Sequence, residues 1–164
     1  MRLLKLAQAT LLLFSLQSWG LAQTGNPTLS AGSKAVLQFG KAFFKSSKAK
    51  PVRHWFERYR DSYSGEMDEY HIAVYPGFRT EFIRSKLYPS DELSSLVIQS
   101  PSIRLPLGIK FGDSPKKVVE ILGPPTSEKP EEIRYDDGMP IAEIIIFRFT
   151  REHLIELELI YDHD

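Results

Sequence analysis

The spacing of apolar and polar residues predicts a short helix between positions 114 and 123. Its apolar side chains follow the i, i+3, i+4 spacing of one helix face: Val118, Ile121 and Leu122. Ser114 suits the N-cap and Pro115 the first helical position, while Gly123 suits a left-handed stop before Pro124. A helix of about two turns is not stable alone in water. We therefore expect its apolar face to pack on the strands that follow it.

The residues after this helix follow the period of β-strands. Residues 133–135 begin a strand, the Asp136-Asp137-Gly138 sequence favours a turn, and the nearly continuous apolar run 141–149 is typical of a central strand. The clearest alternation runs from 154 to 161. It predicts four side chains facing the core, namely Ile155, Leu157, Leu159 and Tyr161, and two facing water, namely Glu156 and Glu158. One dry and one wet face indicate an antiparallel sheet covered by helices on one side.

The first half of the chain predicts a helix followed by strands. Ser33 suits the cap of a helix that runs to about Ser47, although Gly40 in its middle disfavours the helix. Residues 52–63 fit a second helix by their i, i+3, i+4, i+7 apolar spacing, and a strand remains the alternative because aromatic residues favour strands. Further strands are predicted at 70–74, 78–83 and 93–99, with a turn at 75–78 and another at 86–92.

We therefore predict an α+β fold, with one or two short helices packed on an antiparallel sheet. A single domain would span 33–164, and a weak internal similarity divides it into two degenerate repeats, 33–101 and 102–164. Residues 37–40 resemble 109–112, and 75–78 with the two strands that follow resemble 135–162. The first of these similarities would place a helix after Gly40, in conflict with a helix that starts at Ser33, and the sequence leaves both readings open.

Residues 1–22 have the pattern of a secretory signal peptide. Arg2 and Lys5 precede an apolar run, and cleavage is expected between Ala22 and Gln23. A membrane anchor is the less favoured reading, because the apolar run is shorter than the ~20 residues of a spanning helix. Residues 23–32 are rich in Gly, Pro, Ser and Thr and predict a flexible leader. The protein is therefore expected in the periplasm or outside the cell.

Composition excludes several classes of function. The chain has no cysteine, so it has no thiol for a lipid anchor, for thiol chemistry or for a thiolate metal site. Removing the signal peptide leaves 19 basic against 21 acidic residues, which does not favour nucleic acid as a partner. The four histidines are scattered, so no metal site is expected. No nucleophile motif or phosphate-binding loop is present, and we predict no catalytic residue and no cofactor.

The sequence between Gly108 and Pro125, with Tyr135, 147–149 and the closing strand, resembles the β-lactamase-inhibitor-protein-like superfamily. It is also similar to the small SmpA/OmlA outer-membrane lipoproteins. The matching positions of the G-x-S-x-x-x-V-x-x-x-L-G-x-P pattern are Gly112, Ser114, Val118, Leu122, Gly123 and Pro125. The resemblance covers about 60 residues and implies a small envelope or secreted protein that binds other proteins. The lipoprotein cysteine and the cystine pairs of some inhibitors are absent, so no lipid anchor is expected.

Two clusters of residues are candidates for binding. The first combines the residue types that dominate protein interfaces, and we predict that it contacts a partner: Arg53, Trp55, Arg58, Tyr59 and Arg60. The second is a stripe on the polar face of the first helix that suits an anionic lipid surface or, more simply, water: Lys34, Lys41, Lys45 and Lys48. The leading hypothesis is a non-enzymatic module that binds another envelope or secreted protein. The alternatives are a small-ligand carrier or enzyme with a pocket between sheet and helices, and peripheral membrane association.

Overall fold

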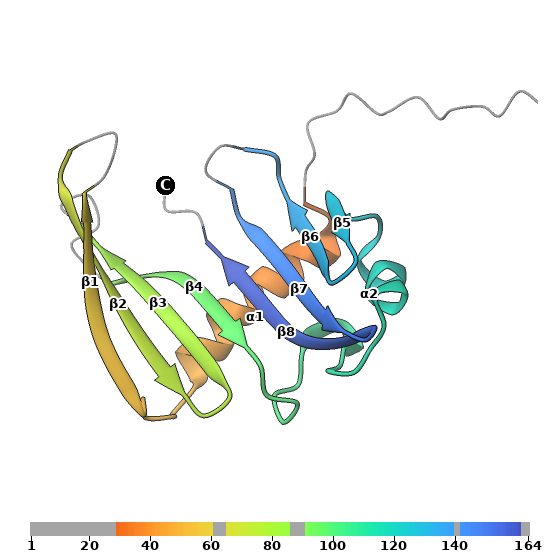
Figure 1. Ribbon diagram of the computed structural model, residues 1–164, viewed down its shortest axis with the longest axis horizontal. Coiled ribbons are helices and arrows are strands. Elements are labelled where there is room, and N and C mark those ends of the chain that lie inside the picture. The colour runs from red at the N-terminus through yellow and green to blue at the C-terminus, as the bar shows by residue number, and fades with distance from the viewer. Residues whose placement is uncertain (1–28, 61–64, 86–90, 140–141, 162–164) are drawn as a thin grey trace, which may run out of the picture.

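The computed structural model describes residues 29–60, 65–85, 91–139 and 142–161. The predicted signal peptide, its cleavage site at Ala22 and Gln23, and most of the predicted leader lie outside the described residues. So does most of the turn predicted at 86–92. Within the described part, two α-helices pack on an antiparallel sheet of eight strands (Figure 1), which confirms the α+β fold.

Each half of the chain contributes one helix followed by four strands. The first half contains α1 (Ala31–Ser46), β1 (Arg53–Arg60), β2 (Met67–Tyr75), β3 (Phe78–Arg84) and β4 (Glu92–Ile98). The second contains a 3₁₀ turn η1 (Pro106–Gly108), α2 (Pro115–Leu122), β5 (Ser127–Lys129), β6 (Glu132–Asp136), β7 (Ile144–Thr150) and β8 (His153–Ile160). The strand order is β1-β2-β3-β4-β8-β7-β6-β5, so the halves meet where β4 pairs with β8.

The element order bears on the two predicted repeats without testing a duplication. The 75–78 turn joins β2 to β3, and Tyr135 lies in β6, which pairs with β7, so this similarity falls on corresponding hairpins. Residues 37–40 lie inside α1, whereas 109–112 precede α2. The similarity between these two segments therefore does not mark corresponding positions of the two halves.

Helix α1 begins earlier than the sequence predicts. Ser30, not Ser33, is the N-cap, and its hydroxyl accepts a hydrogen bond from the Ser33 amide at 3.1 Å. Leu29 belongs to the hydrophobic core. Residues 29–32 are therefore part of the folded body and not of a flexible leader, and the domain begins before residue 33. Ser30 and Gly32, two of the residues that suggested a leader, are the N-cap and a first-turn residue of α1.

Helix α2 forms as its sequence predicts. The Ser114 hydroxyl accepts from the Lys117 amide at 3.3 Å, Pro115 occupies the first turn, and Gly123 has a φ of +88° that favours glycine. Val118 and Leu122 are buried with residues of β6, β7 and β8, and Ile121 packs partly buried against the same cluster. The apolar face of the helix therefore covers the sheet, as expected.

The predicted helix at 52–63 is wrong, because residues 53–60 form strand β1. Their partners in β2 run without interruption from Val74 to Met67. The apolar spacing of this segment fits both periods. Trp55 and Tyr59 are four residues apart, which places them on one face of a helix and also on one face of a strand. The β-propensity of its aromatic residues and its pairing with β2 decide in favour of the strand.

The alternation in β8 is interrupted by a β-bulge. Arg148 lies opposite Glu156, but the next pair joins Phe149 to Leu154, so Ile155 is the extra residue. Leu154 consequently occupies the buried position that the strict alternation assigned to Ile155, which is 48% exposed. The other predicted inward positions, Leu157, Leu159 and Tyr161, are buried.

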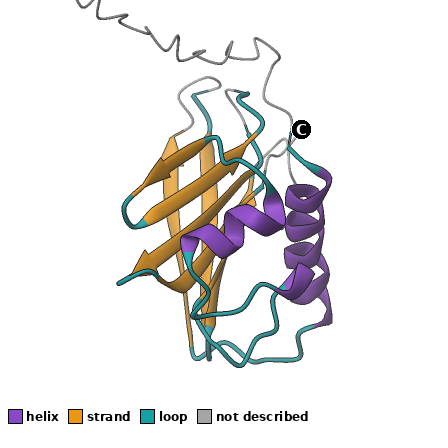
Figure 2. Cartoon of the chain, turned by 90° about the vertical axis from the view of Figure 1, so that its right-hand side faces the viewer, coloured by secondary structure: helices purple, strands orange, loops and turns teal. Residues whose placement is uncertain are grey.

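Both helices lie on the same side of the sheet (Figure 2), and α1 packs across the junction between the two halves. It approaches closely at Gly40, where an added Cβ would overlap the Tyr161 hydroxyl and Leu159 Cδ1. The Tyr161 hydroxyl donates to the Leu37 carbonyl at 3.2 Å. The glycine that disfavoured the helix in the sequence is therefore the residue that lets the helix reach the sheet.

Candidate functional site

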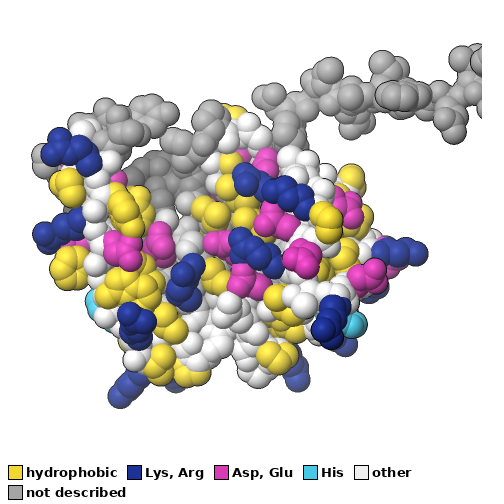
Figure 3. Space-filling model, viewed as in Figure 1, with side chains coloured by type: hydrophobic (Ala, Val, Ile, Leu, Met, Phe, Trp, Pro, Cys, Tyr) yellow, Lys and Arg dark blue, Asp and Glu magenta, His cyan; other side chains and the backbone are white. Residues whose placement is uncertain are grey.

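One face of the sheet has no helix on it, and we call it the open face. Figure 3 shows this face, where apolar side chains surround charged side chains near the middle. Four side chains of the open face are buried outside the helix-side core, namely Ile72, Ile83, Val97 and Ile146. Because these residues are shielded without a covering helix, the open face has an apolar floor beneath its charged groups.

A row of directly opposed residues crosses the open face. It runs from β1 to β7 through Trp55, Ile72, Glu81, Ser95, Ile160 and Ile144. Opposed residues of an antiparallel sheet bring their side chains together on one face. Glu81 is therefore the one carboxylate of this row, directly between the apolar Ile72 and the small Ser95.

Burial raises the pKa of Glu81, and the nearby carboxylates of Glu57 and Glu158 raise it further, while Arg79 acts in the opposite direction. Neither Arg79 nor Glu81 makes an ion pair or hydrogen bond with another side chain in the described part of the chain. A half-buried carboxylate without a partner is costly. This pair of opposite charges therefore remains available to a molecule that docks on the open face.

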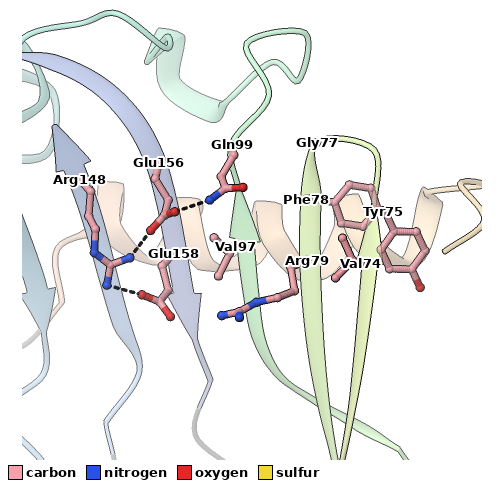
Figure 4. A pocket seen from close by; sticks show the side chains of 10 residues that line it. All are labelled: Val74, Tyr75, Gly77, Phe78, Arg79, Val97, Gln99, Arg148, Glu156 and Glu158. Carbon is pink, nitrogen blue, oxygen red and sulfur yellow. Dashed lines mark hydrogen bonds and ion pairs between the residues drawn. The ribbon is translucent and has the colours of Figure 1, made fainter. Parts of the chain in front are cut away.

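A pocket of about 420 Å³ lies next to Arg79 (Figure 4). Its lining includes Val74 and Val97 on one side and Arg148, Glu156 and Glu158 on the other. Arg148 is ion-paired with Glu156 and also with Glu158, at 2.7 Å in the second case. The charges of this cluster are largely satisfied within the sheet. The pocket therefore provides a concave surface and one guanidinium without an ion pair among the described residues, that of Arg79.

The structure places the predicted partner-binding residues on β1 but divides them between its two sides. Arg53, Trp55 and Tyr59 project on the open face, because they alternate with Phe56, which faces His71 on the helix side. Arg58 and Arg60 project on the helix side by the same alternation. All five belong to one strand, but they do not form a single flat patch.

Local contacts fix several of these side chains. Glu57 accepts hydrogen bonds from the Tyr59 hydroxyl and from Trp55 Nε1, the latter at 2.9 Å, and these bonds lower the pKa of Glu57. The Arg53 guanidinium lies 4.8 Å from the centre of the Trp55 ring. The open-face side of β1 is thus a preordered set of aromatic and charged groups.

On the helix side of the sheet, Glu69 of β2 binds the side chains of Arg58 and His71. It accepts from Arg58 Nε at 2.8 Å and contacts His71 Nε2 at 2.7 Å, and these bonds, the one from Arg58 first, lower the pKa of Glu69. His54 stacks on His71 with ring centres 5.7 Å apart. Within the described ranges, no group of three or more His, Asp or Glu side chains is arranged to hold a metal.

The predicted lysine stripe is only partly helical. Lys34, Lys41 and Lys45 lie in α1 and are exposed, whereas Lys48 follows the end of the helix at Ser46. Lys41 is also 3.4 Å from Glu143. The neighbouring aromatic residue Phe44 packs inward against Tyr75 and Phe82. Phe44 is therefore not turned outward as an apolar residue of a membrane-surface helix would be.

A small pocket of about 300 Å³ lies between α1 and the sheet, lined in part by Lys41, Phe44 and Tyr161. It is where the ligand-carrier hypothesis would place a ligand, and its volume is at the lower limit of about 300 Å³ for ligand sites. Among the described residues, no helix combines the length and the apolar composition that crossing a bilayer requires.

Sequence reasoning did not identify the open-face residues Arg79 and Glu81. Their importance depends on which strands are neighbours, since Glu81 is opposed by Ile72 and Ser95 from two other strands. The only sequence signal for this site is the alternation within 78–83, which places the charged Arg79 and Glu81 on the face opposite Phe78.

The fold and this site can be compared with known proteins. Searches against protein-family models, curated proteins and solved structures gave no match. The resemblance to the β-lactamase-inhibitor-protein-like superfamily therefore stays a prediction, and function has to be inferred from the residues of the open face and of β1.

Proposed function

We propose that the protein is an exported, non-enzymatic module that binds another protein of the bacterial envelope through its open face. The observation that carries the proposal is the pair Arg79 and Glu81, which make no hydrogen bond or ion pair with another side chain within the described ranges and stand on an apolar floor. Charged groups that can be paired by a partner, next to buried apolar and aromatic groups, are features of protein interfaces.

The shape of the open face supports a protein as the ligand. It is a broad sheet surface with a shallow pocket, and Trp55 and Tyr59 stand at its β1 border. Tyrosine, tryptophan and arginine contribute most to the energy of protein interfaces. The predicted signal peptide supports a location outside the cytoplasm, where such a partner would be found.

Affinity capture tests this proposal. The mature chain, residues 23–164, is immobilised and exposed to an envelope extract, in parallel with Arg79→Glu and with Arg104→Glu as a matched control. Arg104 is an exposed arginine in the loop between β4 and α2. The wild type and the control should retain the same partner. Arg79→Glu should lose it while still unfolding in a cooperative thermal melt, at a somewhat lower temperature because it adds a carboxylate near Glu81.

Two results would contradict the proposal. Equal recovery of every protein by Arg79→Glu and by the wild type would exclude the open face, and recovery of no partner by the wild type would contradict a binding module. The export step is tested separately, by the mass of the protein purified from the cell exterior or periplasm. A product that begins at Gln23 is expected, and a product that retains residues 1–22 would contradict signal cleavage.

A further inference from the structure

Strand β1 is an edge of the sheet, and its outer side is unpaired. It is eight residues long, and its register with β2 contains no bulge. The opposite edge of the sheet, β5, has three residues. Proteins usually protect long edge strands with charged side chains, bulges, prolines or covering segments, because an unpaired edge is a template for another strand. Within the described residues, β1 carries charged side chains but has none of the other three, so an incoming strand has to match its charges.

Exposed apolar side chains gather at the same edge. The described part of the chain has seven large hydrophobic residues that are exposed, and four of them lie in or beside β1: Val52 (71%), Phe56 (54%), Tyr59 (56%) and Met67 (52%). Such clustering marks an interaction surface more strongly than single exposed residues do. We call these four residues and the outer edge of β1 the edge patch.

The charges of β1 are unbalanced. The strand contains three arginines and one glutamate. Glu57 is already bonded to Trp55 and Tyr59, and Arg58 is paired with Glu69. Arg53 and Arg60 have no acidic partner among the described residues. A strand that pairs with β1 can satisfy both arginines if it carries acidic side chains, since cross-strand pairs of opposite charge stabilise a sheet.

We propose that the edge patch accepts an extended acidic segment of the partner protein as a ninth strand. This inference names a partner chemistry for the binding module and so rests on the proposed function. Backbone hydrogen bonds to β1 would supply affinity, and side chains opposite Arg53 and Arg60 would supply selectivity. A second copy of the chain that paired its own β1 with this edge would bind less favourably, because both strands carry an excess of positive charge.

Peptide titration tests the inference with the mature chain. The first probe is an eight-residue peptide with glutamate at its first and last positions, to lie opposite Arg53 and Arg60 on the two faces of the sheet, and alternating valine and threonine between them. The other two probes are the same peptide with lysine in place of glutamate, and the glutamate peptide with every amide N-methylated. Trp55 is the only tryptophan after residue 22 and lies in β1, so its fluorescence reports binding at the edge. The glutamate peptide should bind at least tenfold more tightly than either of the other two.

Charge reversal in the protein provides the second arm. Arg53→Glu combined with Arg60→Glu should weaken the glutamate peptide at least tenfold and favour the lysine peptide, and Arg104→Glu should leave both affinities unchanged. Equal binding of the methylated peptide would overturn strand addition, because only side chains would then be recognised. Equal binding of the lysine peptide would overturn the acidic partner. A stable dimer of the free chain in light scattering, broken by the double variant, would assign the edge to a second copy instead.

The two proposals fail separately. If no peptide binds while Arg79→Glu still abolishes capture of a partner, the edge inference is wrong and the proposed function stands. If the glutamate peptide binds as expected while capture recovers no partner through the open face, the open-face proposal is wrong and strand addition at β1 stands.

Discussion

Replacing Gly40 with alanine tests how α1 is held against the sheet. Alanine is favoured over glycine in a helix by about 1 kcal/mol. The structure opposes this gain, since the new methyl group would overlap the Tyr161 hydroxyl and Leu159 Cδ1, with Leu96 Cδ2 at 3.3 Å. Over-packing of this kind costs about 3 kcal/mol at the upper end of its usual range.

The hydroxyl of Tyr161 adds a second cost. It donates to the Leu37 carbonyl, and displacing it would lose about 1 kcal/mol. The sum of the three contributions is a net destabilisation of about 3 kcal/mol. With a urea dependence of about 2 kcal/mol per molar, the unfolding midpoint should fall by about 1.5 M.

Circular dichroism of the mature chain in urea measures the shift. Gly32→Ala is the matched control, because it makes the same change in the same helix and meets only the flexible end of Leu122 at 3.2 Å as its nearest neighbour. Its midpoint should not fall, because the helix-propensity gain is opposed only by this one tight contact. Combining Gly40→Ala with Tyr161→Phe removes one of the overlapping atoms and should recover part of the loss. A Gly40→Ala protein as stable as the wild type would refute the close approach of α1.

Other changes test the core, the open face and the turns. Leu157→Ala should lower the free energy of unfolding by about 2–5 kcal/mol in urea, and an unchanged midpoint would place Leu157 outside the core. The pKa of Glu81 is raised above 4.5 in the folded state, so its ionisation removes stability as pH rises through that range. Glu81→Gln should therefore melt at a higher temperature at pH 7, with no difference at pH 4; the same difference at both pH values would contradict this. Burial raises the pKa of Tyr135 to about 12, so stability should fall as pH rises from 10 towards 12, and Tyr135→Phe should have a shallower fall in alkaline melts. Equal slopes would count against burial of the hydroxyl. Glu152 has a φ of +64°, so Glu152→Gly should raise stability by about 1 kcal/mol, and a lower thermal midpoint would argue that the side chain has a role of its own.

The parts of the fold that the sequence predicts well are those whose signals are local. Ser114, Pro115 and Gly123 specify α2 through backbone preferences that act within a few residues, and the structure confirms them. The bulge at Ile155 has no such signal, because it depends on how Arg148 and Phe149 align with β8. Sequence periodicity can therefore identify β8 as a strand, but it cannot predict that Leu154 and not Ile155 points into the core.

The candidate site divides in the same way. The composition of β1 predicted an interaction surface, and this stays a prediction, whereas the helix predicted for the same residues was wrong. Glu81 and Arg79 were missed because their surroundings come from β1, β2, β4 and β8 together. Neighbours across a sheet are set by strand order and register, and neither is encoded at one position of the chain.

The bond from Tyr161 to Leu37 joins residues 124 positions apart, near the two ends of the described chain. Helix α1 thus gains this support only when β8 and Tyr161 have been made. Until then the emerging polypeptide lacks part of its interior, and contacts between distant segments of this kind slow folding. This delay suits the proposed export, because a chain that passes through a narrow translocation channel must cross before its structure closes.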